Sequence, residues 1–362
     1  MKISFNNTIF SKEKIGGISR YFIFLIKKLI ENEIDIKVVS FLHKNKLLRI
    51  LPKKYLGGFY LPNFPTFKFI DKINIDKFNT YNKFHSIDII HDTYYTPGIQ
   101  KSSGVKKVIT VHDLIHEKFQ HYYRNSEDLI NLKKKSFENC DYFICVSNNT
   151  KKDLIEFYNI DSDKIVVINH GADHLIANNL KNNSLLEFPF LLYVGNRQRY
   201  KNFVFFLKAF AKAKKIKSEF KLVCFGGGAF NNNEKKLMKD LSVIDNVLQI
   251  NGNDNLLSDY YSQANATVIP SIYEGFGFPL LEAMRFNCPI FCSNIDVFKE
   301  ICGQNAFFFN PNDEEDLIYQ LENALLDTSK LKNFSSNNFV RSKNFTWNKT
   351  CLETLNIYRK LN

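Results

Sequence analysis

The sequence predicts an α/β protein built from two doubly wound, Rossmann-like domains with parallel sheets. Short apolar runs alternate with amphipathic stretches along nearly the whole chain, which is typical of repeated β–α–β units. A polar stretch with little periodicity, at residues 169–188, interrupts this alternation, which then restarts, so we interpret the stretch as a linker between domains. The length of 362 residues also suggests about two domains.

The first half of the chain predicts a domain over residues 1–175. Its apolar runs, taken as strands, lie at residues 2–5, 37–41, 88–92, 106–113, 142–147 and 165–168. Helical periodicity is found between several of them, at residues 18–30, 128–139 and 149–158.

The second half predicts a domain over residues 176–345. Its strands are expected at residues 190–195, 220–228, 247–252, 266–270, 289–293 and 306–309. Helices are expected from Asn202, from Asn233, around Ser258 and after Phe278. In doubly wound domains, ligands bind beyond the carboxyl ends of the strands.

Residues 43–84 break the alternating pattern. Prolines and glycines occur there among basic and aromatic residues, at Pro52, Gly57, Gly58, Pro62 and Pro65. One interpretation is a surface excursion of mixed helix and loop. The alternative is a patch that faces an acceptor or touches a membrane, because lysine stems and aromatic rings suit an interface.

Composition excludes several classes of protein. Hydrophobic residues make up 44% and aromatic residues 15%, enough for two cores, so disorder is not expected. No apolar run of membrane-spanning length occurs, and the N-terminus resembles a strand rather than an export signal. Seven cysteines, an odd number without a C-x-x-C pair, indicate free thiols in a reducing cytoplasm rather than disulfides or a zinc site.

The formal charge of +12 has two interpretations. The lysine-rich composition is either surface decoration, or it attracts polyanions such as substrate phosphates, an anionic membrane face or nucleic acid. No helix-turn-helix, RNA-recognition signature or arginine-rich tract is present, so no nucleic-acid partner is expected.

The strongest chemical signal lies at residues 273–284, where a predicted strand leads into a glycine loop and a helix. Gly275 and Gly277 allow the backbone to approach a ligand closely, and the free N–H groups of the helix start favour an anion. Glu274 and Glu282 are good acceptors for sugar hydroxyls. The alternative, a capping glutamate and a surface pair, leaves the two glycines unexplained.

A second signal lies at residues 193–202, again between a strand and a helix. Arg197 and Lys201, near the turn at Gly195, could clamp a pyrophosphate. The alternative is an ordinary solvated basic loop.

Two weaker signals lie in the first half. Gly16 and Gly17 precede the first predicted helix and offer backbone N–H groups, although a turn with a helix cap is the alternative. His112 follows a predicted central strand and would point towards the ligand. A metal site at His112, Asp113 and His116 is conceivable, but no further acidic motif completes it, and a histidine satisfied inside the protein is the other alternative.

Together these motifs resemble family 4 of the retaining glycosyltransferases. The resemblance implies the GT-B fold, with two Rossmann-like domains whose sheets face across a cleft and a closing helix, residues 346–362, that crosses back to the first domain. The similarity covers nearly the whole chain, and the spacing of Glu274 and Glu282 together with the 193–202 loop is its most specific part. The segments GGISRYF, HDLIHE and VCFGGG look like the branch of bacterial O-antigen and capsule mannosyltransferases.

The resemblance also implies roles in binding the donor. Glu274 would touch the hydroxyls of the donor sugar, and Glu282 would touch the ribose. Arg197 and Lys201 would neutralise the pyrophosphate, and His112 would lie near the transferred sugar. Backbone groups complete the predicted site, at Gly16, Gly17, Gly195, Gly252, Gly275, Phe276, Gly277 and Phe278.

One departure from the family pattern is visible. Many relatives place the arginine directly after the glycine, whereas here Asn196 intervenes. Lys201 keeps its usual spacing from Gly195.

The expected activity is transfer of a hexose from a nucleotide diphosphate sugar. The resemblance favours GDP-mannose or a related GDP-sugar as the donor. The acceptor would be a lipid-linked or oligosaccharide molecule in surface-polysaccharide synthesis, at the cytoplasmic face of a membrane, with no metal or cofactor. Two alternatives stay open. One is a non-catalytic subunit that binds nucleotide sugar. The other is an epimerase or phosphorylase of the same fold, although an epimerase fits the pair Glu274 and Glu282 less well.

Overall fold

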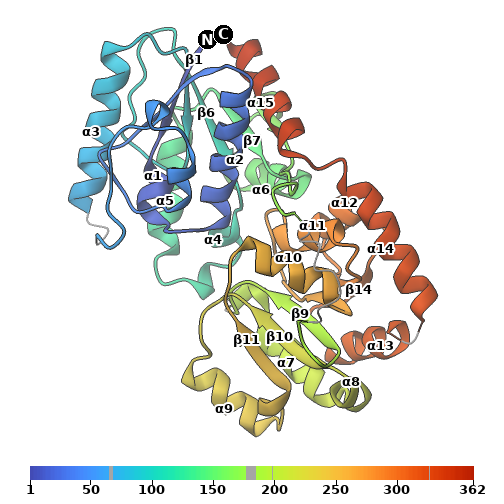
Figure 1. The fold of residues 1–362 in the computed structure, drawn as a ribbon. Helices are drawn as coiled ribbons and strands as arrows, with labels where there is room; N and C mark the ends of the chain where they lie inside the picture. Colours follow the sequence, from blue (N-terminus) through green and yellow to red (C-terminus); the bar gives the residue numbers. More distant parts are fainter. Residues whose placement is uncertain (65–67, 177–184, 198, 326) are drawn as a thin grey trace. The chain divides into compact units, whose positions relative to one another are not determined.

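The computed structural model describes residues 1–64, 68–176, 185–197, 199–325 and 327–362. The chain divides into two compact units (Figure 1). The first unit comprises Met1–Gly171 and Trp347–Asn362, and the second comprises Ala172–Thr346. The chain therefore leaves the first unit, forms the second, and returns.

The first unit is built on a parallel sheet that contains six strands among the described residues. In chain order these are β1 (Lys2–Asn6), β2 (Asp35–Val39), β5 (Ile89–Asp92), β6 (Lys106–Val111), β7 (Tyr142–Cys145) and β8 (Ile165–Val167). Their order across the sheet is β2-β1-β5-β6-β7-β8. The chain passes from β1 to β2 on one side and then crosses to β5 on the other side of β1, so a topological switch point lies between β1 and β5.

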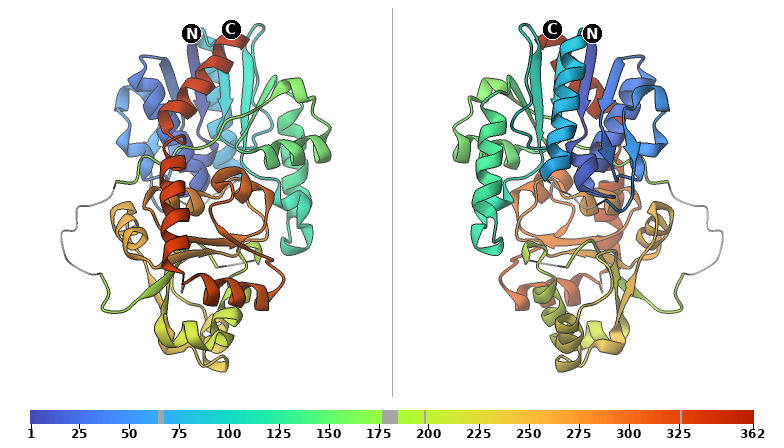
Figure 2. Two further views of the ribbon diagram at one scale, coloured as in Figure 1. Left: turned by 90° about the vertical axis from the view of Figure 1, so that its right-hand side faces the viewer. Right: turned by 90° about the vertical axis from the view of Figure 1, so that its left-hand side faces the viewer.

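The helices of the first unit come from both ends of the chain. They are α1 (Thr8–Lys12), α2 (Gly17–Glu31), α3 (Lys68–Phe84), α4 (Ile115–Lys118), α5 (Ser126–Phe137), α6 (Asn148–Tyr158) and α15 (Trp347–Leu361). Trp347 of α15 stacks on Phe24 of α2, with ring centroids 5.2 Å apart. The hydroxyl of Tyr358 lies 2.5 Å from Nδ1 of His91 on β5. The two ends of the chain consequently lie side by side (Figures 1 and 2).

Residues 43–84 form the expected mixture of helix and loop, together with a short pair of strands that was not predicted. Two short strands, β3 (Leu42–His43) and β4 (Phe59–Tyr60), pair in parallel, and two 3₁₀ turns, Leu47–Ile50 and Lys53–Tyr55, lie between them. Helix α3 follows. Pro65 lies outside the described residues.

The second unit repeats the architecture of the first. Its described strands are β9 (Phe190–Val194), β10 (Lys221–Phe225), β11 (Val247–Ile250), β12 (Ala266–Ile269), β13 (Ile290–Ser293) and β14 (Phe307–Phe309). They are all parallel, in the order β11-β10-β9-β12-β13-β14. The switch point of this sheet lies between β9 and β12.

The helices of the second unit alternate with its strands and then end in a helical run. They are α7 (Phe203–Lys212), α8 (Lys214–Glu219), α9 (Asn232–Asp240), α10 (Asp254–Gln263), α11 (Phe278–Arg285), α12 (Asp296–Cys302), α13 (Glu314–Ala324) and α14 (Thr328–Ser342).

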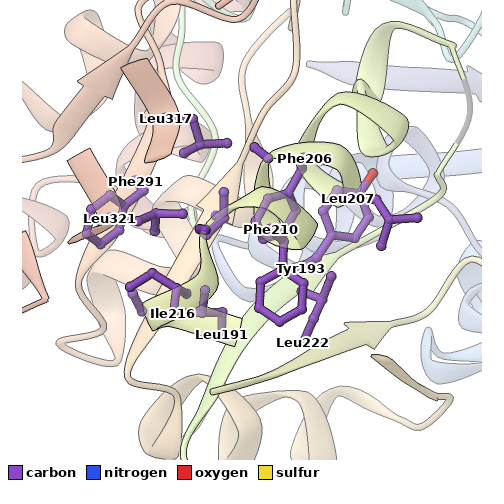
Figure 3. Packing of buried hydrophobic residues seen from close by; sticks show 14 of the residues in the cluster. Leu191, Tyr193, Phe206, Leu207, Phe210, Ile216, Leu222, Phe291, Leu317 and Leu321 are labelled. Carbon is purple, nitrogen blue, oxygen red and sulfur yellow. The ribbon is translucent and has the colours of Figure 1, made fainter. Parts of the chain in front are cut away.

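Helix α7 supplies the centre of the second unit's core. Its apolar residues Phe203, Phe206, Leu207 and Phe210 recur at helical spacing, which makes one face apolar. Figure 3 shows Phe206 and Phe210 packed among strand residues and residues of α13, in one buried cluster. The strand and α13 residues labelled there are Leu191, Tyr193, Leu222, Phe291, Leu317 and Leu321.

The predicted α/β class with parallel sheets is confirmed. Several strands end earlier than predicted, and the largest difference is in the strand expected at residues 220–228. Strand β10 ends at Phe225, because Gly226, Gly227 and Gly228 adopt φ angles of 80°, 72° and 75°, which a strand does not allow. The glycines instead form a loop.

Two predictions about the whole chain concern cysteines and membranes. All seven cysteines lie in the described part of the chain and are free thiols. No helix among the described residues combines the length and the hydrophobicity needed to cross a bilayer.

Phe206→Ala should lower the free energy of unfolding by about 3–5 kcal/mol, because the buried ring leaves a cavity that the core cannot close. Val204 lies on the same helix and is 45% exposed. Val204→Ala should therefore change the free energy of unfolding by about 0.5 kcal/mol or less. Urea unfolding followed by circular dichroism measures both. Equal midpoints for the two variants would contradict this assignment of the core.

Candidate functional site

Two loops meet at the switch point of the second unit. One follows β9 and includes residues 195–197 and 199–202, and the other follows β12 and spans residues 270–277. The backbone N–H of Ile272 donates to the carbonyl of Tyr200 at 2.8 Å, which joins the two loops. Gly195 begins the first loop with a φ of 117°, a conformation that favours glycine.

Lys201 and Glu274 connect the same two loops through their side chains. Lys201 Nζ lies 2.6 Å from Glu274 Oε1, which also accepts a hydrogen bond from the Ser271 hydroxyl at 2.7 Å. Both side chains are largely buried, with 15% and 10% exposed. Because an ammonium group has three donors, the contact with Glu274 leaves Lys201 able to bind an anion as well.

Helix α11 begins where the second loop ends. Gly277 precedes it with a φ of 100°, and a Cβ atom at this position would lie 2.8 Å from the ring of Phe298, so only glycine fits. The residues Gly275, Phe276, Gly277 and Phe278 thus form the approach to the helix and its first turn. Backbone N–H groups at such a start favour an anionic ligand.

Glu282 lies in α11, one turn further on, and is buried. The hydroxyl of Tyr261 on α10 donates to its Oε2 at 2.9 Å. Sequence reasoning did not find Tyr261, because its distance of 21 residues from Glu282 carries no local signal. The carboxylate is therefore held in one orientation by a neighbouring helix.

Arg197 is not brought together with Lys201. Its guanidinium donates to Glu234 Oε1 at 2.8 Å and to the carbonyl oxygens of Gly226 and Gly228 at 3.1 and 2.9 Å. The side chain is buried, and its charge is compensated by a carboxylate different from that of Lys201. Arg197 comes two residues after Gly195, and its side chain reaches the glycine loop after β10.

Glu234, which sequence reasoning also missed, ties Arg197 to helix α9. The backbone N–H of Asn231 donates to Glu234 Oε2 at 2.8 Å, and the Asn231 side chain accepts from the N–H of Glu234 at 2.9 Å. This capping box fixes the start of α9. Arg197 accordingly holds the loop and the helix start in place.

Gly252 follows β11 at the same edge of the sheet. A Cβ atom there would lie 2.6 Å from a side-chain carbon of Leu256 and 3.1 Å from the ring of Phe225. The neighbouring Gln249 donates to the carbonyl of Gly226 at 3.3 Å. The loop after β10 is therefore linked to strand β11.

In the first unit, Gly16 and Gly17 begin helix α2, as the sequence suggested, but an internal carboxylate already lies there. The N–H of Ser19 donates to Glu13 Oε2 at 3.3 Å, and the N–H of Gly16 donates to the Ser19 hydroxyl at 3.1 Å. Burial raises the pKa of Glu13. Glu13 was not singled out in the sequence, since a lone glutamate before a glycine pair is not distinctive.

His112 directly follows β6 and lies in a group of aromatic and imidazole rings. Its ring is 5.1 Å from that of Tyr21 and stacks on His170 at 5.8 Å. Among the described residues, its buried Nε2 has no hydrogen-bond partner. Burial lowers the pKa of His112 to about 4, so the imidazole is neutral at pH 7.

His91, next to this group, is held on both ring nitrogens by Tyr358 and by Thr110, the latter at 2.8 Å. Burial lowers its pKa to about 3. In the part of the chain that the structure describes, no cluster of histidine, cysteine, aspartate and glutamate could hold a metal ion.

The second unit therefore places an ammonium group, two carboxylates and a helix start at one switch point. Such a set suits a ligand that carries both an anionic group and hydroxyls.

Two family models match the chain. The model described as "Glycosyltransferase Family 4" matches residues 15–174, and the one described as "Glycosyl transferases group 1" matches residues 176–341. Each model covers most of one unit.

Several named mannosyltransferases are similar in sequence. The O-antigen chain mannosyltransferase RfbU of Salmonella typhimurium is 30% identical over 269 residues, which is 73% of this chain and 71% of RfbU. O-antigen chain mannosyltransferase B of Escherichia coli is 24% identical over 238 residues, 63% of this chain and 62% of that protein. The serotype-specific mannosyltransferase WbdA of Escherichia coli is 26% identical, and the match spans 34% of its length.

Solved glycosyltransferase structures share the fold. WaaG, a glycosyltransferase involved in lipopolysaccharide biosynthesis, has a TM-score of 0.77 at 15% identity, over 98% of this chain and 99% of that chain. HepE of Anabaena, in complex with UDP-glucose, has a TM-score of 0.74 at 16% identity, over 99% of this chain and 100% of that chain.

Arg197→Gln should lower the free energy of unfolding by about 3 kcal/mol, because it leaves the Glu234 carboxylate without its buried partner. Hydrogen exchange should also become faster at residues 226–229, which lose their clamp. The control is Lys208→Gln on the exposed face of α7, which removes the same charge. Unchanged exchange in Arg197→Gln would show that the arginine does not hold the loop.

Stability should fall as the pH drops from about 7 to 5. The buried His91 and His112 stay neutral in the folded protein, whereas in the unfolded chain they bind protons below about pH 6.5. Below about pH 6.5, the loss from each histidine approaches about 1.4 kcal/mol per pH unit.

Melting temperatures measured from pH 7.5 to 5 test this dependence. His112→Gln should flatten the slope, and His121→Gln, at an exposed position, should leave it unchanged. Identical slopes for wild type and His112→Gln would contradict the burial of His112.

Proposed function

The chain belongs to the family 4 glycosyltransferases, with the GT-B fold, and from this we propose that it transfers a hexose from a nucleotide diphosphate sugar with retention of configuration. The observation that carries the proposal is the set of Lys201, Glu274 and Glu282 at the switch point between β9 and β12. This is the edge at which doubly wound domains bind nucleotides.

Each group of the set matches one part of such a donor. Lys201 and the N–H groups at the start of α11 would bind the pyrophosphate. Glu274 would accept hydrogen bonds from the hydroxyls of the sugar. Glu282, oriented by Tyr261, would accept from the ribose hydroxyls.

We propose that the chemistry rests on stabilising the leaving group. As the bond from the sugar C1 to the phosphate oxygen breaks, negative charge grows on the diphosphate, and fixed positive groups lower the barrier. The acceptor oxygen bonds to C1 on the same face, and its proton passes to the departing phosphate. No metal would be required, because Lys201 and the helix N–H groups supply the positive charge.

Three predicted residues enter the proposal differently from the rest. Arg197 would reach the diphosphate only by leaving Glu234, so we assign it to holding the glycine loop and assign neutralisation to Lys201. Gly16 and Gly17 would receive phosphate only when Glu13 moves aside. His112 is neutral, and its buried Nε2 has no partner among the residues that the structure describes, so it would accept a hydrogen bond near the transferred sugar.

We infer the donor and the acceptor from the names of the similar proteins. RfbU and O-antigen chain mannosyltransferase B are named as mannosyltransferases, which supports GDP-mannose as the donor and a lipid-linked or oligosaccharide acceptor in surface-polysaccharide synthesis. We place the enzyme at the cytoplasmic face of the membrane. The charge of +12 and the exposed Phe59 and Phe84 of the excursion support contact with anionic lipid.

The donor assignment is tested by thermal shift with UDP, GDP, ADP, dTDP and CMP, each with and without Mg²⁺. A ligand that binds only the native state raises the melting temperature. We expect GDP to do so without metal, and Glu282→Ala to reduce the shift through an affinity loss of roughly ten-fold or more. If no nucleotide shifts the wild type, the donor site is wrongly assigned.

Glu274→Gln separates binding from turnover in the same protein. It should keep most of the GDP shift and lose roughly 100-fold or more in GDP-mannose turnover, the size seen when one group that stabilises a transition state is removed. Glu219→Gln, on the exposed end of α8, is the matched control. Wild-type turnover in Glu274→Gln would exclude a role for this residue.

A further inference from the structure

The segment that follows His112 is held by a buried network of side chains from two helices. Lys133 of α5 places its Nζ 2.8 Å from Glu117 Oε2 and donates to the carbonyl oxygen of Asp113 at 3.2 Å. The side chains of Lys133 and Glu117 are 1% and 3% exposed. One ammonium group thus joins both ends of the short stretch from Asp113 to Glu117, which begins directly after His112.

A second helix holds the same segment through the other carboxylate oxygen. The Tyr158 hydroxyl on α6 donates to Glu117 Oε1 at 2.5 Å. Burial, together with this hydrogen bond, raises the pKa of Tyr158, so the hydroxyl keeps the proton that it donates. Lys118, the last residue of α4, pairs with the buried Asp153 of α6 at 2.6 Å. Two successive residues of the segment are therefore bound by side chains of α5 and α6.

Stability alone does not account for a buried lysine and glutamate at this place. Both charges lose their hydration on folding, and an apolar pair of similar size is often as stable or more so. Apolar neighbours are at hand, because Leu114 and Phe137 belong to a buried cluster that also contains Tyr95. Lys133 Nζ lies over the Tyr95 ring, 5.0 Å from its centroid. What the charged groups add in such surroundings is direction, since each hydrogen bond fixes the place of one particular atom.

The orientation of His112 depends on the backbone that carries it. Its buried Nε2 has no hydrogen-bond partner among the described residues, so no bond to this atom fixes the ring. The nearest fixed point along the chain is the Asp113 carbonyl oxygen, which accepts from Lys133 at 3.2 Å and from the Tyr95 hydroxyl at 3.4 Å. A shift of this carbonyl would move the backbone of His112 and, with it, the ring.

We propose that Lys133 is a positioning residue, which places the His112 ring against the transferred sugar by way of the Asp113 carbonyl and Glu117. The inference rests on the proposed function, because it requires that His112 contacts the donor sugar during transfer. Lys133 is buried and acts on the reaction only by keeping Nε2 of His112 in one place. Displacement of a reacting group by about 1 Å can slow a reaction by about 100-fold.

A double variant, Lys133→Met with Glu117→Gln, tests the proposal without leaving a lone buried charge. The first change keeps an apolar stem, and the second keeps an oxygen that can accept from Tyr158. The protein should therefore stay folded, with a melting temperature and a GDP thermal shift close to those of the wild type. The matched control is Lys135→Met with Glu127→Gln, at exposed positions of the same helix.

Release of GDP from GDP-mannose separates positioning from binding. In the double variant, kcat should fall by about 10- to 100-fold while KM for GDP-mannose changes by less than about two-fold, because the donor groups of the second unit are unchanged. A general loss of structure would reduce the GDP thermal shift as well. Hydrogen exchange should become faster at residues 113–118 and stay as in the wild type at residues 226–229. The control pair should match the wild type in every measurement.

Wild-type kcat in the double variant would overturn the proposal, and so would wild-type hydrogen exchange at residues 113–118. If the double variant does not fold, Tyr158→Phe takes its place, because this change removes only the hydroxyl that binds Glu117. A fall in kcat at unchanged KM is expected there too, and an unchanged kcat would again contradict the proposal. A wild type that neither responds to GDP nor releases it from GDP-mannose would instead overturn the proposed function itself.

Discussion

The ion pair between Lys201 and Glu274 is the interaction on which the site of the second unit depends. It joins the loops after β9 and β12, which are 73 residues apart in sequence, and it does so in a largely buried position. The backbone bond from Ile272 to Tyr200 reinforces the same junction. Since Gly277 and the start of α11 continue directly from the second loop, the pair also sets where the helix N–H groups point.

Much of this site could be predicted from the sequence because each component sits on a local pattern. A strand, a glycine loop and a helix in succession are recognisable along the chain, and Glu274 and Glu282 lie within one such segment. The strands could be predicted for a similar reason, since a buried parallel strand is a short apolar run. The three glycines after β10 show the limit, because composition alone did not reveal their left-handed φ angles.

What escaped prediction are the partners that tertiary structure brings from a distance. Tyr261 orients Glu282, Glu234 compensates Arg197, and Glu13 occupies the start of α2. The sequence showed that the arginine comes two residues after Gly195, but its partners depended on Glu234 and on the carbonyl groups of the glycine loop. The partners of this charged side chain are thus set by groups that lie far from it in sequence.

The return of the chain to its first unit has a consequence for its synthesis. Trp347 and Tyr358 are fully buried side chains of the first unit, yet they belong to a helix that is synthesised only after the whole second unit. The second unit is continuous in sequence and has all its core residues once residue 346 has emerged. During translation the first unit therefore cannot complete its folding, because the surface that packs against α15 is still exposed. The second unit can already fold. Until α15 packs onto it, the first unit would expose its aromatic residues Tyr21 and Phe24, which are candidate contacts for a chaperone.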